Sequence, residues 1–246
     1  MEQSVYDVEA KVEATHWWFV GRRKLFANMI KPLRILRDAT VLDVGSGTGS
    51  NLRLLQGLKF SRVTGVDQSE DAIRYCAEKN LGLVRQADVC DLPFGDGAFQ
   101  LILATDIVEH VDEKKSLAEI YRTLAPGGYA LLTVPAFQTL WGVQDEKCHH
   151  RMRYRKPQFE TVTRDAGFGI VRSFYFNYLM FGPIFIGRKI IKMFNIALES
   201  EGQINTPWIN RIMNVVFSFD VYTSPRFNPP FGVSILILAR KPVARD

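Results

Sequence analysis

Three glycines at alternate positions, Gly45, Gly47 and Gly49, are the residues of this sequence best suited to binding a ligand. They follow a short apolar run, residues 41–44, and precede a stretch with helical character, residues 50–56. Glycine lacks a Cβ atom, so the backbone of such a turn can approach a ligand closely. The helix start adds free N–H groups and a positive dipole end, which suit a carboxylate or a phosphate. The segment therefore predicts a strand, a tight turn and a helix around a bound small molecule.

The next strand-like run, residues 62–67, ends in Asp67. At this place in nucleotide-binding α/β units, an acidic residue accepts hydrogen bonds from the ribose hydroxyls. A dinucleotide fingerprint, G-x-G-x-x-G/A, would require Gly or Ala at position 50, where this chain has Ser50. The glycines and Asp67 thus predict a nucleoside-containing cofactor. A nicotinamide-dependent oxidoreductase is the competing interpretation, against which Ser50 argues.

Further motifs follow in order between residues 40 and 135, and the whole set resembles the class I S-adenosylmethionine-dependent methyltransferases. The motifs are 41–49, 65–67, 87–89, 92–94, 99–105, 108–111 and 124–128. The resemblance implies an enzyme of the EC 2.1.1 class, with S-adenosyl-L-methionine as cofactor and S-adenosyl-L-homocysteine as product. It is of the small-molecule type and is similar to methyltransferases of the ubiquinone and menaquinone pathways. The segment after the strand at 99–105 lacks the Asn/Asp-Pro-Pro-Tyr/Phe tetrapeptide of amino-directed nucleic acid methyltransferases, so a nucleic acid substrate is not expected.

The same resemblance implies how the cofactor is held. The three glycines line its methionine part, and Asp67 binds the ribose hydroxyls. Asp88 binds the adenine amino group, with Val89 against the ring. The residues expected to bind the cofactor are Asp43, Gly45, Ser46, Gly47, Gly49, Asp67, Gln68, Asp88, Val89 and Thr105.

Methyl transfer from a sulfonium is an in-line displacement, and a base is needed only if the acceptor atom carries a proton. Candidate bases should follow the carboxyl ends of the fourth and fifth strands. A histidine near its ordinary pKa is the natural acceptor for the proton of a hydroxyl or amine. We therefore expect His150 to be the first choice as base and His110 the second, with Asp145 part of the same site.

The series Asp106-x-x-Glu109-His110 raises the alternative of a metal site. It is similar to the Glu-x-x-Glu-His set that holds a divalent ion in some ubiquinone-pathway O-methyltransferases, but the first residue is shorter. A helix-capping or substrate-facing role is the favoured interpretation, and no metal site is predicted.

Composition limits the setting of the protein. The 246 residues are 47% hydrophobic, as in an ordinary globular protein. Three scattered cysteines give neither a disulfide framework nor a metal-ligand spacing, and the polar N-terminus does not resemble a signal peptide. These features predict a cytoplasmic protein. Positive charge is concentrated after residue 150, within a net charge of +5, and this points toward anionic partners such as phospholipid head groups, sugar phosphates or nucleic acid. A solvated surface without a partner is the alternative.

Alternating strand and helix patterns predict an α/β fold, a Rossmann-like doubly wound sheet of seven strands. The strands are expected near 40–44, 62–67, 83–87, 99–105, 129–134, 169–176 and 232–240, and helices near 50–57, 70–79, 113–124 and 157–166. By the resemblance, the last strand is antiparallel. We expect four segments: an N-terminal helical cap or lid (1–38), the cofactor-binding core (39–176), a helical insertion rich in aromatic and basic residues (177–230), and the final strand (231–246).

The insertion has two interpretations. Helical spacing over residues 184–198 and 208–219 gives each segment one polar face. The helices either cap the substrate pocket or lie in a membrane interface. Both interpretations favour a bulky apolar or lipid-linked small-molecule acceptor that is methylated on an O or N atom. In the second interpretation, the cytoplasmic protein would lie at the membrane surface. A non-catalytic cofactor-binding partner protein is the remaining alternative.

Overall fold

The computed structural model describes residues 2–194 and 206–243. The predicted seven-stranded sheet is confirmed, with strand order β3-β2-β1-β4-β5-β7-β6. β7 pairs antiparallel with both β5 and β6, whereas the pairs among β1 to β5 are parallel. The strands are β1 (Thr40–Val44), β2 (Arg62–Asp67), β3 (Leu83–Gln86), β4 (Phe99–Thr105), β5 (Leu124–Pro135), β6 (Gly169–Phe176) and β7 (Ser234–Arg240).

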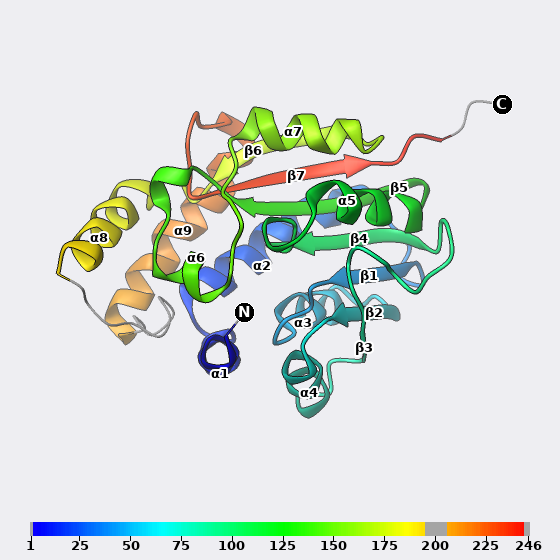
Figure 1. Cartoon of the computed structure of the whole chain (residues 1–246), viewed down its shortest axis with the longest axis horizontal. Coiled ribbons are helices and arrows are strands. Elements are labelled where there is room, and N and C mark those ends of the chain that lie inside the picture. The colour runs from blue at the N-terminus through cyan, green and yellow to red at the C-terminus, as the bar shows by residue number, and fades with distance from the viewer. Residues whose placement is uncertain (1, 195–205, 244–246) are drawn as a thin grey trace.

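Helices cover both faces of this sheet (Figure 1). The α-helices are α1 (Gln3–Val12), α2 (Trp17–Ile30), α3 (Ser50–Gly57), α4 (Glu70–Glu78), α5 (Glu113–Thr123), α6 (Val143–Lys147), α7 (Lys156–Asp165), α8 (Phe181–Met193) and α9 (Pro207–Phe227). The short 3-10 helices of the described residues are η1 (Lys31–Leu33), η2 (Val108–His110) and η3 (Gln138–Leu140). The part of the insertion at 195–205 lies outside the described residues, as do residue 1 and residues 244–246.

The core has two layers, one on each side of the sheet. On one face, α5 and α7 bury Leu117, Ile120 and Phe159 against the strands. On the other face, α2, α3 and α9 bury a second cluster that includes Phe26 and Phe217. The central strands β1, β4, β5 and β7 are mostly apolar and buried, as expected for a sheet covered on both sides.

The parallel strands direct their carboxyl ends to one edge of the sheet. In Figure 1 the arrowheads of β4 and β5 point toward the side that carries α6 and α8, and β7 runs the opposite way. Loops at the carboxyl ends of parallel strands are the usual location of ligand sites in α/β sheets. The candidate site should therefore lie between this edge and the helices α8 and α9.

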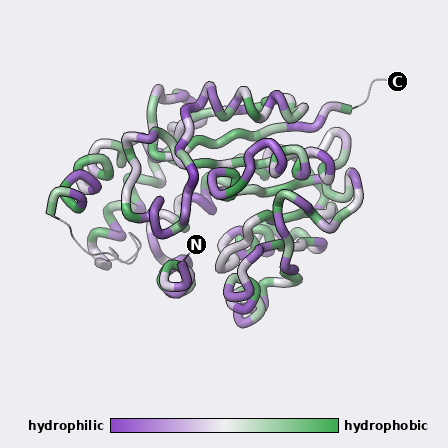
Figure 2. The backbone as a smooth tube through the Cα atoms, in the orientation of Figure 1, coloured by the Kyte–Doolittle hydropathy of each residue, from purple (hydrophilic) through white to green (hydrophobic). Residues whose placement is uncertain are grey.

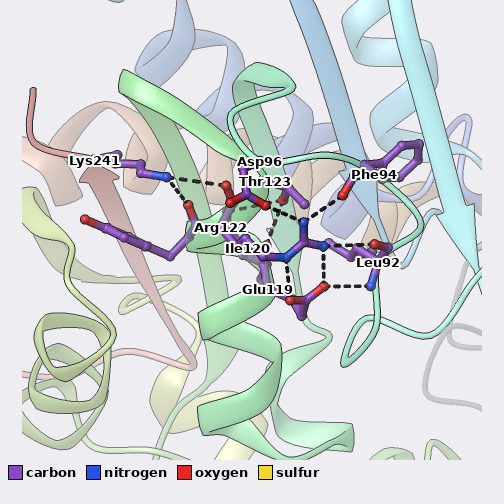
Figure 3. A network of polar contacts seen from close by, with 9 residues as sticks. Leu92, Phe94, Asp96, Glu119, Ile120, Arg122, Thr123 and Lys241 are labelled. Carbon is purple, nitrogen blue, oxygen red and sulfur yellow. Dashed lines mark hydrogen bonds and ion pairs between the residues drawn. The ribbon is translucent and has the colours of Figure 1, made fainter.

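Arg122 on α5 fixes the loop that follows β3 (Figure 3). Its guanidinium donates to the carbonyl oxygens of Leu92 (3.0 Å) and Phe94 (2.7 Å) and forms ion pairs with Glu119 and Asp96. The Glu119 carboxylate in turn accepts a hydrogen bond from the Leu92 N–H at 2.9 Å. This network gives a loop without regular secondary structure a defined position beside the sheet edge.

Hydropathy along the backbone shows where the fold departs from a simple inside–outside pattern. In Figure 2, α8 alternates green and purple although it lies at the outer edge of the molecule. Within the described residues, no helix is both long enough and apolar enough to cross a bilayer.

Candidate functional site

A cavity of about 760 Å³ lies at the carboxyl edge of the sheet. This is within the range of roughly 300–1,000 Å³ that ligand pockets occupy. Its lining comes from the glycine loop and β2, from the segments after β4 and β5, and from α1, α2, α8 and α9. One space therefore joins the predicted cofactor residues, the predicted bases and the helical insertion.

The glycine loop presents backbone to this cavity. Gly45 and Gly47 line it and have φ values of +71° and +52°, a conformation that side chains disfavour. A Cβ atom on Gly47 would meet no heavy atom within 4 Å, so the space beside its backbone is open. Gly49 (φ +97°) differs from the expectation, because it is not among the residues that line the cavity, and a Cβ atom there would lie 2.2 Å from Cδ1 of Leu81. The absence of a side chain lets the start of α3 lie against Leu81 and Cys76.

Asp67 lies at the end of β2 and holds the loop in place. Its carboxylate accepts hydrogen bonds from the Gly47 and Ser69 N–H groups, each at 2.9 Å. Burial raises the pKa of this carboxyl group, and these backbone hydrogen bonds partly oppose the rise. Asp67 lines the cavity with Gln68, and it still has lone pairs for donors such as ribose hydroxyls.

Asp43 lies behind the residues that line the cavity. Its side chain is fully buried and accepts a hydrogen bond from Asn51 Nδ2 at 2.9 Å. The same amide donates to Thr105 Oγ1 at 2.9 Å, and the Ser46 hydroxyl donates to the Asp43 carbonyl oxygen. Burial raises the pKa of Asp43 to about 7. Of these residues Ser46, Asn51 and Thr105 line the cavity, so Asp43 positions the loop through residues that face it.

At the part of the site expected to bind adenine, the position of Asp88 differs from the prediction. Its neighbours Ala87 and Val89 line the cavity, but Asp88 is exposed, and its carboxylate accepts a hydrogen bond from the Cys90 N–H at 2.8 Å. Asp88 begins a turn through residues 89 and 90, and its carboxylate binds the backbone of that turn instead of lining the cavity.

The two histidines predicted as bases, His150 and His110, lie next to each other. His150 Nδ1 lies 2.8 Å from Asp145 Oδ1, so its other ring nitrogen is directed toward Glu109 Oε1 at 4.0 Å. The rings of His110 and His150 meet edge to face, with centroids 4.6 Å apart. Burial and the neighbouring His150 lower the pKa of His110 to about 4. Both histidines line the cavity, and His150 is the one whose orientation a carboxylate fixes.

Asp145 is buried behind His150 and carries a charge. Arg153 binds it through two hydrogen bonds, Nε to Oδ1 at 2.7 Å and Nη2 to Oδ2 at 2.9 Å. Burial alone would raise its pKa, but the hydrogen bonds with His150 and Arg153 hold the pKa of this carboxyl well below its usual range. A charged Asp145 favours a proton on the facing nitrogen of His150 and leaves the other nitrogen free to accept one.

The metal alternative weighed from sequence is not the set that the structure assembles. Asp106 is turned away, paired with Arg22 at 2.8 Å and accepting a hydrogen bond from Thr133 at 3.0 Å. Among the described residues, the donor atoms that gather within 4.8 Å are those of Glu109, His110 and His150. Both Glu109 oxygens are buried without a hydrogen-bond partner in the described chain, and burial with the charge of Asp106 raises the pKa of Glu109 well above its usual range.

Several lining residues carry no motif in the sequence. Glu9 and Tyr6 on α1 line the cavity, as do Asn177 after β6 and Arg188 on α8. The Asn177 amide is buried, and neither its nitrogen nor its oxygen has a hydrogen-bond partner in the described part of the chain. A lone Asn at a strand end gives no sequence signal, because its importance depends on burial.

Comparison with known proteins agrees with this architecture. A family model described as a methyltransferase domain matches residues 42–132. A ubiquinone/menaquinone biosynthesis C-methyltransferase of Desulfotalea psychrophila is 36% identical over 93 residues, 36% of this chain and 38% of that protein. A fatty-acid O-methyltransferase of Mycolicibacterium smegmatis is 32% identical over 132 residues, 51% of this chain and 42% of that protein. The chain thus matches less than half the length of these relatives.

Similarity to solved structures extends over more of the chain. A chain in the complex that contains the Trm112 methyltransferase activator of Haloferax volcanii aligns with a TM-score of 0.65 at 19% identity, covering 98% of this chain and 96% of that one. Such a likeness concerns the fold. Residues 42–132 are thus a methyltransferase domain, and the fold around them is that of the class I S-adenosylmethionine-dependent methyltransferases, whose cofactor is S-adenosyl-L-methionine.

The residues present fit that cofactor. The open space beside Gly47, the acceptor oxygens of Asp67 and the apolar side chain of Val89 suit its amino-acid, ribose and adenine parts, respectively. Arg22 on α2 lies at the same cavity, stacked on Trp18 and Phe26 with its carbon Cζ 5.4 and 5.2 Å from the ring centroids. Its guanidinium is a candidate partner for the cofactor carboxylate.

Proposed function

We propose that this chain transfers the methyl group of S-adenosyl-L-methionine to an O or N atom of a bulky apolar or lipid-linked small molecule. The observation that carries the proposal is that one cavity contains the cofactor loop, an oriented histidine and an apolar wall. In the reaction, the acceptor's lone pair forms the new bond to the methyl carbon as the carbon–sulfur bond breaks. The acceptor's proton passes to the free nitrogen of His150, and S-adenosyl-L-homocysteine is released.

The apolar wall supports the acceptor class. Ile184 and Ile191 on α8, Ile209 and Met213 on α9, and Trp18 on α2 line the cavity that holds the glycine loop. Burial of apolar surface contributes about 25 cal/mol per Å², so such a wall favours a large hydrocarbon group over a small polar metabolite. The buried and unpartnered Asn177 amide suits one polar group on that molecule, because unpaired buried amides are costly.

The first experiment is calorimetric titration of the purified chain with S-adenosyl-L-homocysteine, with NADH as the control. Micromolar binding of the former alone is expected. Binding of NADH alone would favour the oxidoreductase alternative. Absence of both would overturn the cofactor assignment for this chain.

The second experiment measures transfer of radioactive methyl groups to long-chain fatty acids, quinols and sterols in detergent micelles. With the hydroxyl acceptors, the quinols and sterols, His150→Asn should lower the turnover number at least about 100-fold, because general-base contributions are typically 10²–10⁴, while S-adenosyl-L-homocysteine still binds. A fatty-acid carboxylate carries no proton near neutral pH, so its methylation should depend less on His150. His149→Asn is the matched control, since His149 also lines the cavity but is exposed. Cofactor binding without transfer to any acceptor would instead favour the non-catalytic partner protein, and a product methylated on carbon would contradict the assignment to O or N.

A further inference from the structure

The outer surface of α9 carries an apolar stripe that faces away from the fold. Trp208, Ile212, Val215, Phe219 and Tyr222 recur at spacings of four and three residues and are exposed. Their exposed fractions include 65% for Trp208, 68% for Val215 and 59% for Phe219. Residues at this spacing share one helix face, and the rise along the helix from residue 208 to residue 222 is about 21 Å. An apolar stripe of this length is unusual on a surface that faces only water.

α8 adds a second apolar surface. Ile186, Ile190 and Met193 follow the same spacing, and Met193 is 69% exposed. The opposite sides of the two helices are already occupied. Ile184 and Ile191 of α8 line the cavity, and Phe217 and Val221 of α9 are buried against the core. Both helices thus present apolar side chains inward and outward, and only the inner ones are explained by the fold and the cavity.

The exposed charged side chains of α8 and α9 are basic. Lys189 and Lys192 on α8 and Arg211 and Arg226 on α9 are exposed, whereas the one acidic residue of the two helices, Asp220, is fully buried. The Asp220 carboxylate accepts hydrogen bonds from the N–H groups of residues 177–179, so its charge is used inside the fold. The outer face therefore combines Trp, Tyr and Phe with basic side chains and has no acidic group among its described residues.

We propose that this outer face of α8 and α9 docks on the surface of an anionic phospholipid bilayer. Aromatic and aliphatic side chains would enter the head-group region, and the lysines and arginines would pair with lipid phosphates. A helix of a protein partner would also cover apolar side chains, but the basic side chains beside them on α8 and α9, as far as the structure describes the two helices, are complementary to an anionic surface. The same helices wall the cavity, so docking would place the cavity beside the bilayer. The proposal concerns binding to lipid and holds whether or not the acceptor is itself a lipid.

The test is sedimentation of the full chain with vesicles of phosphatidylcholine alone or with 30% phosphatidylglycerol. We expect the chain to sediment with the anionic vesicles at low salt and to be released at 0.5 M NaCl. The double variant Val215→Glu/Phe219→Glu should reduce the bound fraction at least tenfold. Lys189→Glu/Lys192→Glu should reduce binding to anionic vesicles more than binding to neutral ones.

Leu36→Glu is the matched control, because Leu36 is 72% exposed but lies outside both helices. It should sediment like the parent chain. All variants should bind S-adenosyl-L-homocysteine as the parent does, which separates loss of docking from loss of folding or of the cofactor site. A blue shift of tryptophan fluorescence on vesicle addition should disappear in Trp208→Phe.

Two results would overturn the proposal. The first is a parent chain that stays in the supernatant with anionic vesicles, or a double variant that sediments as well as the parent. The second is a dimer in sedimentation equilibrium that the double variant dissociates, because the face would then be occupied by a second copy of this chain.

Discussion

Asp67 and Asp88 are both acidic residues at strand ends, but the structure gives them different surroundings. Asp67 lines the cavity and holds the glycine loop, whereas Asp88 is exposed beside it. Asp67→Ala should weaken binding of S-adenosyl-L-homocysteine by at least about tenfold, since hydrogen bonds to a charged group contribute roughly 1.5–3 kcal/mol. Asp88→Ala should change it less than threefold in the same titration calorimetry. Equal losses in both variants would mean that Asp88 reaches the adenine group, as the family resemblance implies.

His110 makes stability depend on pH in a predictable direction. Its pKa is about 4 in the folded chain, against about 6.5 when unfolded, so between these values only the unfolded chain binds the proton. Above pH 7, where His110 is neutral in both states, the free energy of unfolding is therefore not reduced by this residue. As the pH falls from 6.5 to 4, the free energy of unfolding decreases by roughly 3 kcal/mol at most.

The measurement is urea unfolding of the parent and His110→Asn at pH 7.5 and pH 5. Other titrating groups are shared by the two proteins, so the difference in the free energy of unfolding isolates His110. The variant should gain relative to the parent at pH 5. A difference that does not change with pH would contradict the neutral, buried state of this histidine.

The contact between α2 and α9 depends on a glycine. A Cβ atom at Gly21 would lie 2.1 Å from Cδ1 of the buried Phe217, whose ring also stacks on Trp18 with centroids 5.6 Å apart. Gly21→Ala should therefore destabilise the protein by about 1–3 kcal/mol, because an overpacked core must shift. Gly57→Ala is the control, since its Cβ would meet no atom within 4 Å, and it should change stability by less than about 1 kcal/mol. Similar urea midpoints for both variants would contradict the close packing of the two helices.

The N-terminal helix is tied to the cofactor side of the molecule. Glu13, just after α1, is buried, pairs with Lys79 at 2.8 Å and accepts a hydrogen bond from the Thr48 hydroxyl. Because α1 also lines the cavity, cofactor binding and the position of α1 should be coupled. S-adenosyl-L-homocysteine should slow amide hydrogen exchange in α1.

Glu13→Ala should speed amide exchange in α1 and weaken S-adenosyl-L-homocysteine binding several-fold. Lys11→Ala, at an exposed position of the same helix, should do neither. Exchange in α1 that is unaffected by the cofactor would show that the first helix is independent of the site.

Much of the fold was predictable because it depends on local pattern. β1, β2, β4 and β6 and the helix α3 begin and end at or within one residue of the predicted positions, since apolar periodicity and glycine turns act over a few residues. β5 begins earlier than expected, at Leu124 rather than near 129, because pairing with β4 and not local propensity sets its start.

Other features were decided only by the tertiary structure. The sequence placed Asp106, Glu109 and His110 within one turn, but the packing of the loop after β5 brings His150 to Glu109 and His110 while Asp106 turns to Arg22. It also turns Gly49 toward Leu81 and leaves Asp88 exposed.

Residue types and short-range spacing thus determined the cofactor class, the order of the sheet elements and the set of candidate bases. Which side chains share the cavity, and which apolar residues of α8 and α9 remain outside, depended on contacts between segments more than 100 residues apart in the chain, such as that of Gly21 with Phe217. Such contacts follow from the packing of whole elements, and no local pattern encodes them.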